Sequence, residues 1–220
     1  MKRFLLEYLP AWLLLMVFGF IVIHAPLTVW VGTQWPELAL PVKAWKELAT
    51  GLAALLIAAA MYQKGALKRF VTRPLVAGLL AYVALHVFMI GLYPQGVQAT
   101  VAGLMIDLRY VLYFIAVYGS LQLYPRYKRP FIRVAVVGAV IVVGFAVLQT
   151  VLPKETLALI GYGDSTIQPY LTVDKNPDYI RHNSTLRGPN PLGAYAAIVL
   201  AGVTAFWLNR QRINRSRVTP

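Results

Sequence analysis

The stretch FIRVAVVGAVIVVGFAVLQTVL, residues 131–152, decides the fold class of this chain. Its only charged residue is Arg133, and its 22 residues are enough for a helix to cross the apolar core of a bilayer, which takes about 20 residues. Its apolar residues do not alternate with polar ones, as they would in a strand of a membrane barrel. Because only helices and closed barrels satisfy the backbone inside lipid, the stretch predicts a transmembrane α-helix.

Five further stretches have the same character. The sequence therefore predicts an all-α, polytopic bundle of about six transmembrane helices, forming a single integral membrane domain over residues 1–220. The first stretch is longer than the apolar run of a typical signal peptide, so we interpret it as an uncleaved anchor. The predicted spans are residues 9–31, 44–62, 75–93, 100–120, 131–152 and 191–208.

The composition excludes several classes of protein. The chain is 59% hydrophobic and only 13% charged, although its net charge is +13. A basic balance of this size often indicates a nucleic-acid partner, but this chain is too apolar for a soluble nucleic-acid binder, and we expect none. Disorder is excluded by the same hydrophobicity. The absence of Cys excludes disulfides, Cys-ligated zinc and a thiol nucleophile.

The distribution of the basic residues predicts the orientation. Cytoplasmic loops are enriched in Lys and Arg, and the basic segments alternate with the spans so that all of them fall on one side. These segments are residues 2–3, 64–73, 126–133 and 210–217. The prediction is N-in and C-in, with residues 153–190 forming a long extracytoplasmic loop. The predicted outer segments are electrically neutral, so the net charge is mainly an orientation signal.

Ionisable residues inside the predicted spans are candidate functional groups. Asp107 and Arg109 are two positions apart on one helix, so they should not pair with each other, and His86 on the preceding helix is placed to meet Asp107. This intramembrane network fits either interhelical packing or the lining of a substrate path. Lys46 and Glu47 lie near the outer face, where they fit either a solvated helix start or an outer polar site.

The segment RHNSTLRGPNPLGAY, residues 181–195, carries the most information about function. Arg181 and Arg187 precede the last span on its outer side, Pro191 suits a helix start, and Asn190 could cap that helix. Arginine is suited to bidentate binding of phosphate, and helix N-termini favour anions. The segment therefore predicts a site for a lipid headgroup or a lipid-linked phosphate, or else a capped helix start with two interfacial arginines.

This segment resembles the signature of the O-antigen ligase and O-antigen polymerase family, roughly Arg-x-x-Gly/Ser-Thr-Phe-x-x-Pro-Asn before a membrane helix. The residues that fit are Arg181, Ser184, Thr185, Leu186, Pro189 and Asn190, with Leu186 in the aromatic position. Lys46-Glu47 at the start of an early helix and Arg109 within a later helix also resemble the family. The resemblance is specific over about 15 residues and extends over most of the chain only as topology.

The resemblance implies a glycosyltransferase of the bacterial inner membrane. Such an enzyme moves a glycan from a polyprenyl-diphosphate carrier to an acceptor on the outer face. Arg181, Arg187 and Asn190 would bind the diphosphate, without metal or cofactor. His182 does not occupy the position of the family's catalytic His, and catalytic residues are not assigned. We expect the chain to be an N-terminal portion, a truncated reading frame or a short relative, with the C-terminal catalytic part missing, which leaves enzymatic activity open.

Two other functions fit the same residues. One is a six-helix transporter or flippase that uses His86, Asp107 and Arg109 in a central path. The other is a non-catalytic membrane assembly subunit. In each case membrane lipids are the expected surroundings. No Gly-rich nucleotide loop, metal-ligand cluster or Ser/His/Asp arrangement is evident in the sequence.

Overall fold

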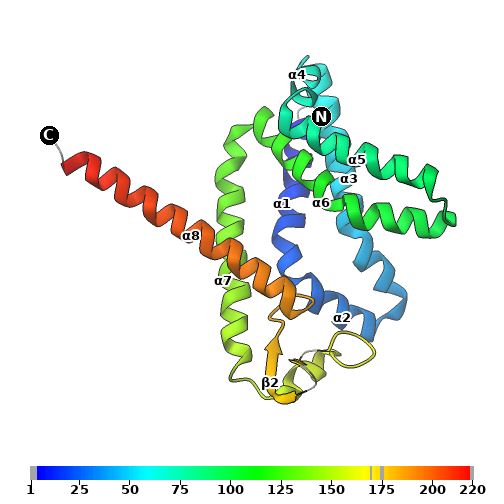
Figure 1. Ribbon diagram of the computed structural model, residues 1–220, viewed down its shortest axis with the longest axis vertical. Coiled ribbons are helices and arrows are strands. Elements are labelled where there is room, and N and C mark those ends of the chain that lie inside the picture. Colours follow the sequence, from blue (N-terminus) through cyan, green and yellow to red (C-terminus); the bar gives the residue numbers. More distant parts are fainter. Residues whose placement is uncertain (1–3, 169, 174–175, 219–220) are drawn as a thin grey trace. The chain divides into compact units, whose positions relative to one another are not determined.

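The computed structural model describes residues 4–168, 170–173 and 176–218 (Figure 1). It is 83% helical and contains six helices long and apolar enough to cross a membrane, which confirms the predicted all-α membrane bundle. These helices span Phe4–Gln34, Pro36–Gln63, Pro74–Leu92, Val97–Leu123, Pro125–Gln149 and Pro189–Gln211. Lys2 and Arg3, which contribute to the predicted orientation, lie outside the described residues.

The first span is interrupted near its middle. It consists of α1 (Leu9–Phe20), a 3₁₀ turn (Ile21–Ile23) and α2 (His24–Gln34). The interruption precedes Pro26. In a regular helix the ring of Pro26 would clash with the carbonyl of Val22, four residues earlier, and Pro26 has no N–H to donate to that carbonyl. The sequence prediction treated residues 9–31 as one uninterrupted span and did not include this break.

Each of the other predicted spans coincides with one long helix, although the second helix begins five residues before the predicted start at Ala44 and the last continues ten residues past the predicted end at Leu208. These helices are α3 (Ala39–Gln63), α5 (Pro74–Leu92), α6 (Val97–Leu123), α7 (Lys128–Gln149) and α8 (Pro189–Val218). Helix α7 ends three residues before the predicted limit at Leu152. The residue before a proline avoids the helical conformation, so Pro153 favours a helix that ends upstream of it.

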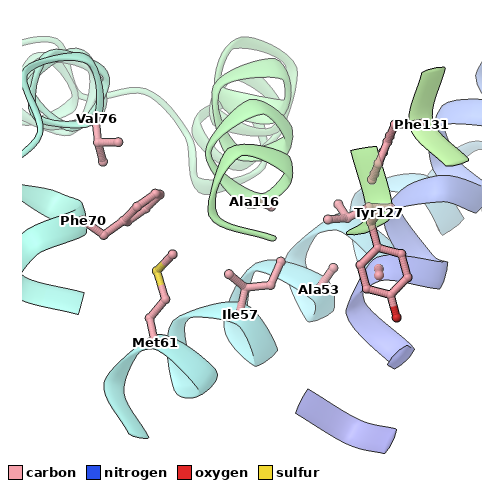
Figure 2. Close-up of a cluster of buried hydrophobic side chains, with 10 residues drawn as sticks. Ala53, Ile57, Met61, Phe70, Val76, Ala116, Tyr127 and Phe131 are labelled. Atoms are coloured by element: carbon pink, nitrogen blue, oxygen red, sulfur yellow. The ribbon is translucent and has the colours of Figure 1, made fainter. Parts of the chain in front are cut away.

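The chain divides into two compact units. Unit 1 comprises Met1–Gly19 and Leu40–Val134. Its core lies where α3 packs on α6, because a Cβ added to Gly119 would lie 3.0 Å from Ile57 Cγ2 and 3.2 Å from Met61 Cε. The short helix α4 (Leu67–Val71) inserts Phe70 into this core. Figure 2 shows Ile57, Met61, Phe70 and Ala116 within this cluster.

Unit 2 comprises Phe20–Ala39 and Ala135–Pro220. The predicted outer loop folds here into a 3₁₀ helix (Lys154–Ile160) and an antiparallel hairpin of β1 (Tyr170–Val173) and β2 (Asn176–His182). Tyr162 packs with Val29 and Leu157, and this burial raises the pKa of its phenol to about 12. The loop is therefore tied to α2 by a small hydrophobic core of its own.

Candidate functional site

The turn between β2 and α8 is anchored by two buried hydrogen bonds. The Ser184 backbone N–H donates to Gln149 Oε1 at 2.8 Å, and the Ser184 hydroxyl donates to the Val142 carbonyl at 2.6 Å. Gln149 and Ser184 are 1% and 2% exposed. Both acceptors lie on α7, seven residues or about two helical turns apart. The turn is thus fixed to one helix at two points, and we call residues 181–190 the arginine turn.

The backbone of Ser184 is unusual. Its φ of 54° is the only positive value at a non-glycine residue in the described part of the chain. Residues other than glycine, Asn and Asp avoid this left-handed conformation, because their Cβ atom comes too close to the following carbonyl oxygen. The two hydrogen bonds to α7 hold Ser184 in this conformation, which turns the chain from β2 into α8.

Arg181 and Asn190, at the two ends of the arginine turn, are in contact with each other. Arg181 lies on β2 opposite Leu171, and its Nη2 donates to Asn190 Oδ1 at 2.5 Å, so residues nine positions apart are in contact. Arg187 lies between them in sequence and is exposed. A guanidinium has five N–H donors, so this bond leaves Arg181 able to donate to a further acceptor.

The start of α8 differs from the prediction. The helix begins at Pro189, and the Gly188 carbonyl accepts the first helical hydrogen bond, from Leu192 N at 3.2 Å. The prediction that Asn190 caps a helix starting at Pro191 is therefore wrong. Because Pro189 and Pro191 have no N–H, Asn190 supplies the only backbone donor among the first three residues of α8. An anion here would depend on the arginine side chains much more than on the helix terminus.

Two polar side chains beside Ser184 are buried with an atom that has no hydrogen-bond partner among the described residues. These atoms are Asn183 Oδ1 and Thr185 Oγ1, and the two residues are 1% and 7% exposed. The Asn183 amide itself is fixed, because Nδ2 donates to the Gln168 carbonyl at 2.8 Å. Buried polar groups are nearly always paired, so these atoms are candidates for contact with a water or a ligand.

The intramembrane polar residues lie in unit 1, on α5 and α6. His86 Nε2 lies 4.0 Å from Asp107 Oδ2, and His86 Nδ1 lies 3.0 Å from the Tyr82 carbonyl. The two side chains are neighbours, but this distance is too long for a hydrogen bond, and a polar network of His86, Asp107 and Arg109 stays a prediction. The Arg109 guanidinium lies 4.7 Å from the centroid of the Tyr110 ring, and its Nε is buried without a partner in the described structure.

The face of α6 that continues from Arg109 is turned toward protein. Tyr113 donates its hydroxyl to the Leu14 carbonyl at 3.0 Å, and Ala116 and Ser120 are 2% and 0% exposed. Asp107 lies off this face, and its side chain is 53% exposed. Arg109 therefore lies at the end of a face that packs against protein, whereas Asp107 lies at the helix surface.

Lys46 and Glu47 form an ion pair within α3. Lys46 Nζ lies 3.1 Å from Glu47 Oε1 and donates to the Lys43 carbonyl at 2.6 Å. Their side chains are only 15% and 16% exposed, so they are not a solvated helix start. Both lie in unit 1, whereas the arginine turn lies in unit 2.

Sequence reasoning identified Arg181, Arg187 and Asn190 but not the residues that hold the turn. The available signal was that Gln149 is one of the few polar residues in the apolar stretch 131–152. Its contact with Ser184 joins residues 35 positions apart and could not be read from spacing. No protein-family model, curated protein or solved structure matches this chain.

Proposed function

We propose that this multi-pass membrane protein binds a polyprenyl-diphosphate-linked glycan through the arginine turn, as an O-antigen ligase-like protein of the bacterial inner membrane. The observation that carries the proposal is the fixed geometry of the turn. Arg181 is bonded to Asn190, and the intervening Ser184 is fixed to α7 by two buried hydrogen bonds. A mere connection between β2 and α8 would not need this buried polar framework.

The chemistry of the turn suits a diphosphate. Guanidinium groups form charge-assisted, bidentate hydrogen bonds with phosphate oxygens, and two arginines match the charge of a diphosphate diester. Arg181 is held in place by Asn190, while Arg187 is exposed and free to adjust to the ligand. In glycan transfer, the bond between the anomeric carbon and the phosphate oxygen breaks. Charge then develops on the departing polyprenyl diphosphate, where these cations would stabilise it.

A second candidate is transport through the bundle, using His86, Asp107 and Arg109. The observation that favours it is the 4.0 Å approach of His86 to Asp107 between two membrane helices. Intramembrane ionisable groups mark substrate pathways in many transporters. This candidate places the functional residues in unit 1 instead of unit 2.

Binding of undecaprenyl diphosphate to the full chain in detergent, measured by native mass spectrometry, tests the proposal. Each charge-assisted hydrogen bond contributes about 1.5–3 kcal/mol, so we expect Arg181→Ala to weaken binding by roughly ten- to a hundredfold. The matched control is Arg210→Ala, which removes an equally charged, exposed side chain from α8. Asp107→Asn should leave binding unchanged.

Binding that is retained in Arg181→Ala and lost in Asp107→Asn would instead favour the transporter. If neither variant changes the binding, or if Arg210→Ala weakens it as much as Arg181→Ala, the arginine turn is not the site. A non-catalytic assembly role then becomes the better explanation. Transfer of the glycan is tested separately, by the appearance of free polyprenyl diphosphate when a lipid-linked glycan and an acceptor are supplied.

A further inference from the structure

Seven cations of unit 1 lie on two connections, the one that joins α3 to α5 through α4 and the one that joins α6 to α7. The two connections are adjacent, because Lys64 Nζ lies 4.4 Å from the centroid of the Tyr124 ring, and Arg73 Nη1 donates to the Tyr118 hydroxyl at 2.9 Å. We call these cations the basic patch. Its members are Lys64, Lys68, Arg69, Arg73, Arg126, Lys128 and Arg129.

Helix α4 holds part of the basic patch in a fixed position. Phe70 is 7% exposed, belongs to the core of unit 1, and has its ring centroid 5.8 Å from that of Tyr118. The two preceding residues, Lys68 and Arg69, are exposed. One aromatic side chain therefore anchors this short helix while its neighbours present two charges outward, as in helices that lie along a membrane interface.

The charges of the basic patch are poorly compensated by the protein. Arg126 pairs with Glu7, and its guanidinium also lies near the rings of Tyr8 and Tyr127. Within the described ranges, no other member has a carboxylate within 4 Å. Six cations thus lie on two adjacent connections without an acidic partner, an arrangement that attracts anions from the surroundings.

Exposed apolar side chains border the basic patch near the starts of α5 and α7. Leu75 follows Arg73 in the first turn of α5, and Ile132 follows Arg129 in the first turns of α7; they are 52% and 53% exposed. A ligand with an anionic head and apolar chains would match this change from cations to exposed aliphatic side chains. An inorganic anion would use only the cations.

We propose that the basic patch binds the headgroup of an anionic phospholipid, whose phosphodiester oxygens accept hydrogen bonds from Lys68, Arg69, Lys128 and Arg129. Its acyl chains lie along the exposed aliphatic side chains of α5 and α7. Clusters of Lys and Arg beside membrane helices recognise anionic lipids in this way. The patch thus does more than orient the chain, and this inference is independent of the function proposed for the arginine turn.

The test uses the full chain in dodecyl maltoside, titrated separately with phosphatidylglycerol and phosphatidylcholine that carry the same fluorescent acyl chain. We expect tighter binding of phosphatidylglycerol, and a loss on the order of fivefold for each cation removed, hence about 25-fold for Lys68→Gln/Arg69→Gln. The control Lys43→Gln/Arg210→Gln removes the same charge from exposed positions outside the patch. Circular dichroism verifies that each variant is folded, and Lys128→Gln/Arg129→Gln repeats the test on the second connection.

Three results would overturn the inference. One is equal affinity for the two lipids in the unmodified chain. Another is an equal loss in the control and the Lys68→Gln/Arg69→Gln variant, since binding would then follow net charge alone. The third is displacement of phosphatidylglycerol by glycerol phosphate at a similar concentration, which would show that the patch binds phosphate groups and not the lipid. Selective loss in both patch variants, with no such displacement, supports it.

Discussion

The basic patch and the arginine turn are both cationic, but they are built on opposite principles. The patch has seven cations, and those on α4 and at the start of α7 are exposed and bonded to no carboxylate of the described structure. The turn has two arginines, one bonded to Asn190, and its backbone is fixed by Gln149 and Val142. Many exposed charges favour attraction of anions in general, whereas few charges on a fixed frame favour recognition of one shape.

The strongest test of this contrast is to break the frame without touching an arginine. In Gln149→Leu the buried Ser184 N–H loses its acceptor, and we expect a loss of unfolding free energy of about 1–3 kcal/mol. Undecaprenyl diphosphate binding should weaken as well, while phosphatidylglycerol binding at the patch stays unchanged. Unfolding in mixed detergent micelles measures the stability.

Thr150→Val is the matched control for that variant. Thr150 is the next residue along the chain, is exposed, and its hydroxyl donates to the nearby Val147 carbonyl. If Thr150→Val lowers both quantities as much as Gln149→Leu, the turn does not depend on the Gln149 contact.

Salt should separate the two regions. Exposed charges are screened as the Debye length falls from about 10 Å at 0.1 M to about 3 Å at 1 M salt. Over this range we expect phosphatidylglycerol binding at the patch to weaken about tenfold. Undecaprenyl diphosphate binding at the turn, with its fixed hydrogen bonds, should weaken only about threefold. Equal salt dependence in the two titrations would show that the patch and the turn bind their ligands through the same screened attraction.

The left-handed backbone of Ser184 gives a smaller test. Ser184→Gly and Ser184→Ala both lose the hydroxyl bond to Val142, but only glycine adopts a φ of 54° without strain. We expect Ser184→Ala to be less stable than Ser184→Gly by about 1 kcal/mol, measured by unfolding. An alanine variant as stable as the glycine variant would mean that the turn relaxes to another conformation.

The smallest effect is expected for the ion pair between Arg126 of the basic patch and Glu7. Glu7→Gln releases Arg126 from its carboxylate and adds an uncompensated cation, so phosphatidylglycerol affinity should rise about two- to threefold. Glu37→Gln removes an equally charged group from an exposed position in unit 2 and serves as the control. A similar rise in both variants would assign the effect to net charge.

The sequence was sufficient to predict the membrane helices because about 20 consecutive apolar residues have few other structures open to them. It also placed His86 and Asp107 on spans joined by a short loop, and the two side chains lie 4.0 Å apart, although their role stays a prediction. It did not predict the interruption at Ile21–Ile23, although Pro26 was the signal for it.

The sequence indicated only part of how the arginine turn is built. Charged residues are visible in any sequence, so Arg181 and Arg187 could be named as candidates, and their binding role stays a prediction. The residues that hold the turn depend on contacts such as Ser184 with Gln149, 35 positions apart, which spacing does not encode. Asn190 was misassigned as a cap because Pro191 was taken as the helix start, when Pro189 already begins the helix.

The two prolines at the start of α8 have a consequence for the entropy of ligand binding. Each ring fixes φ near −65°, so the residues on both sides of Asn190 have lost most of their backbone freedom before any partner arrives. In the unfolded chain the same rings reduce the number of accessible conformations, which lowers the entropy lost on folding. Asn190 therefore presents its carbonyl oxygen to Arg181 from a preorganised backbone, and the guanidinium is oriented in advance for the next acceptor it meets.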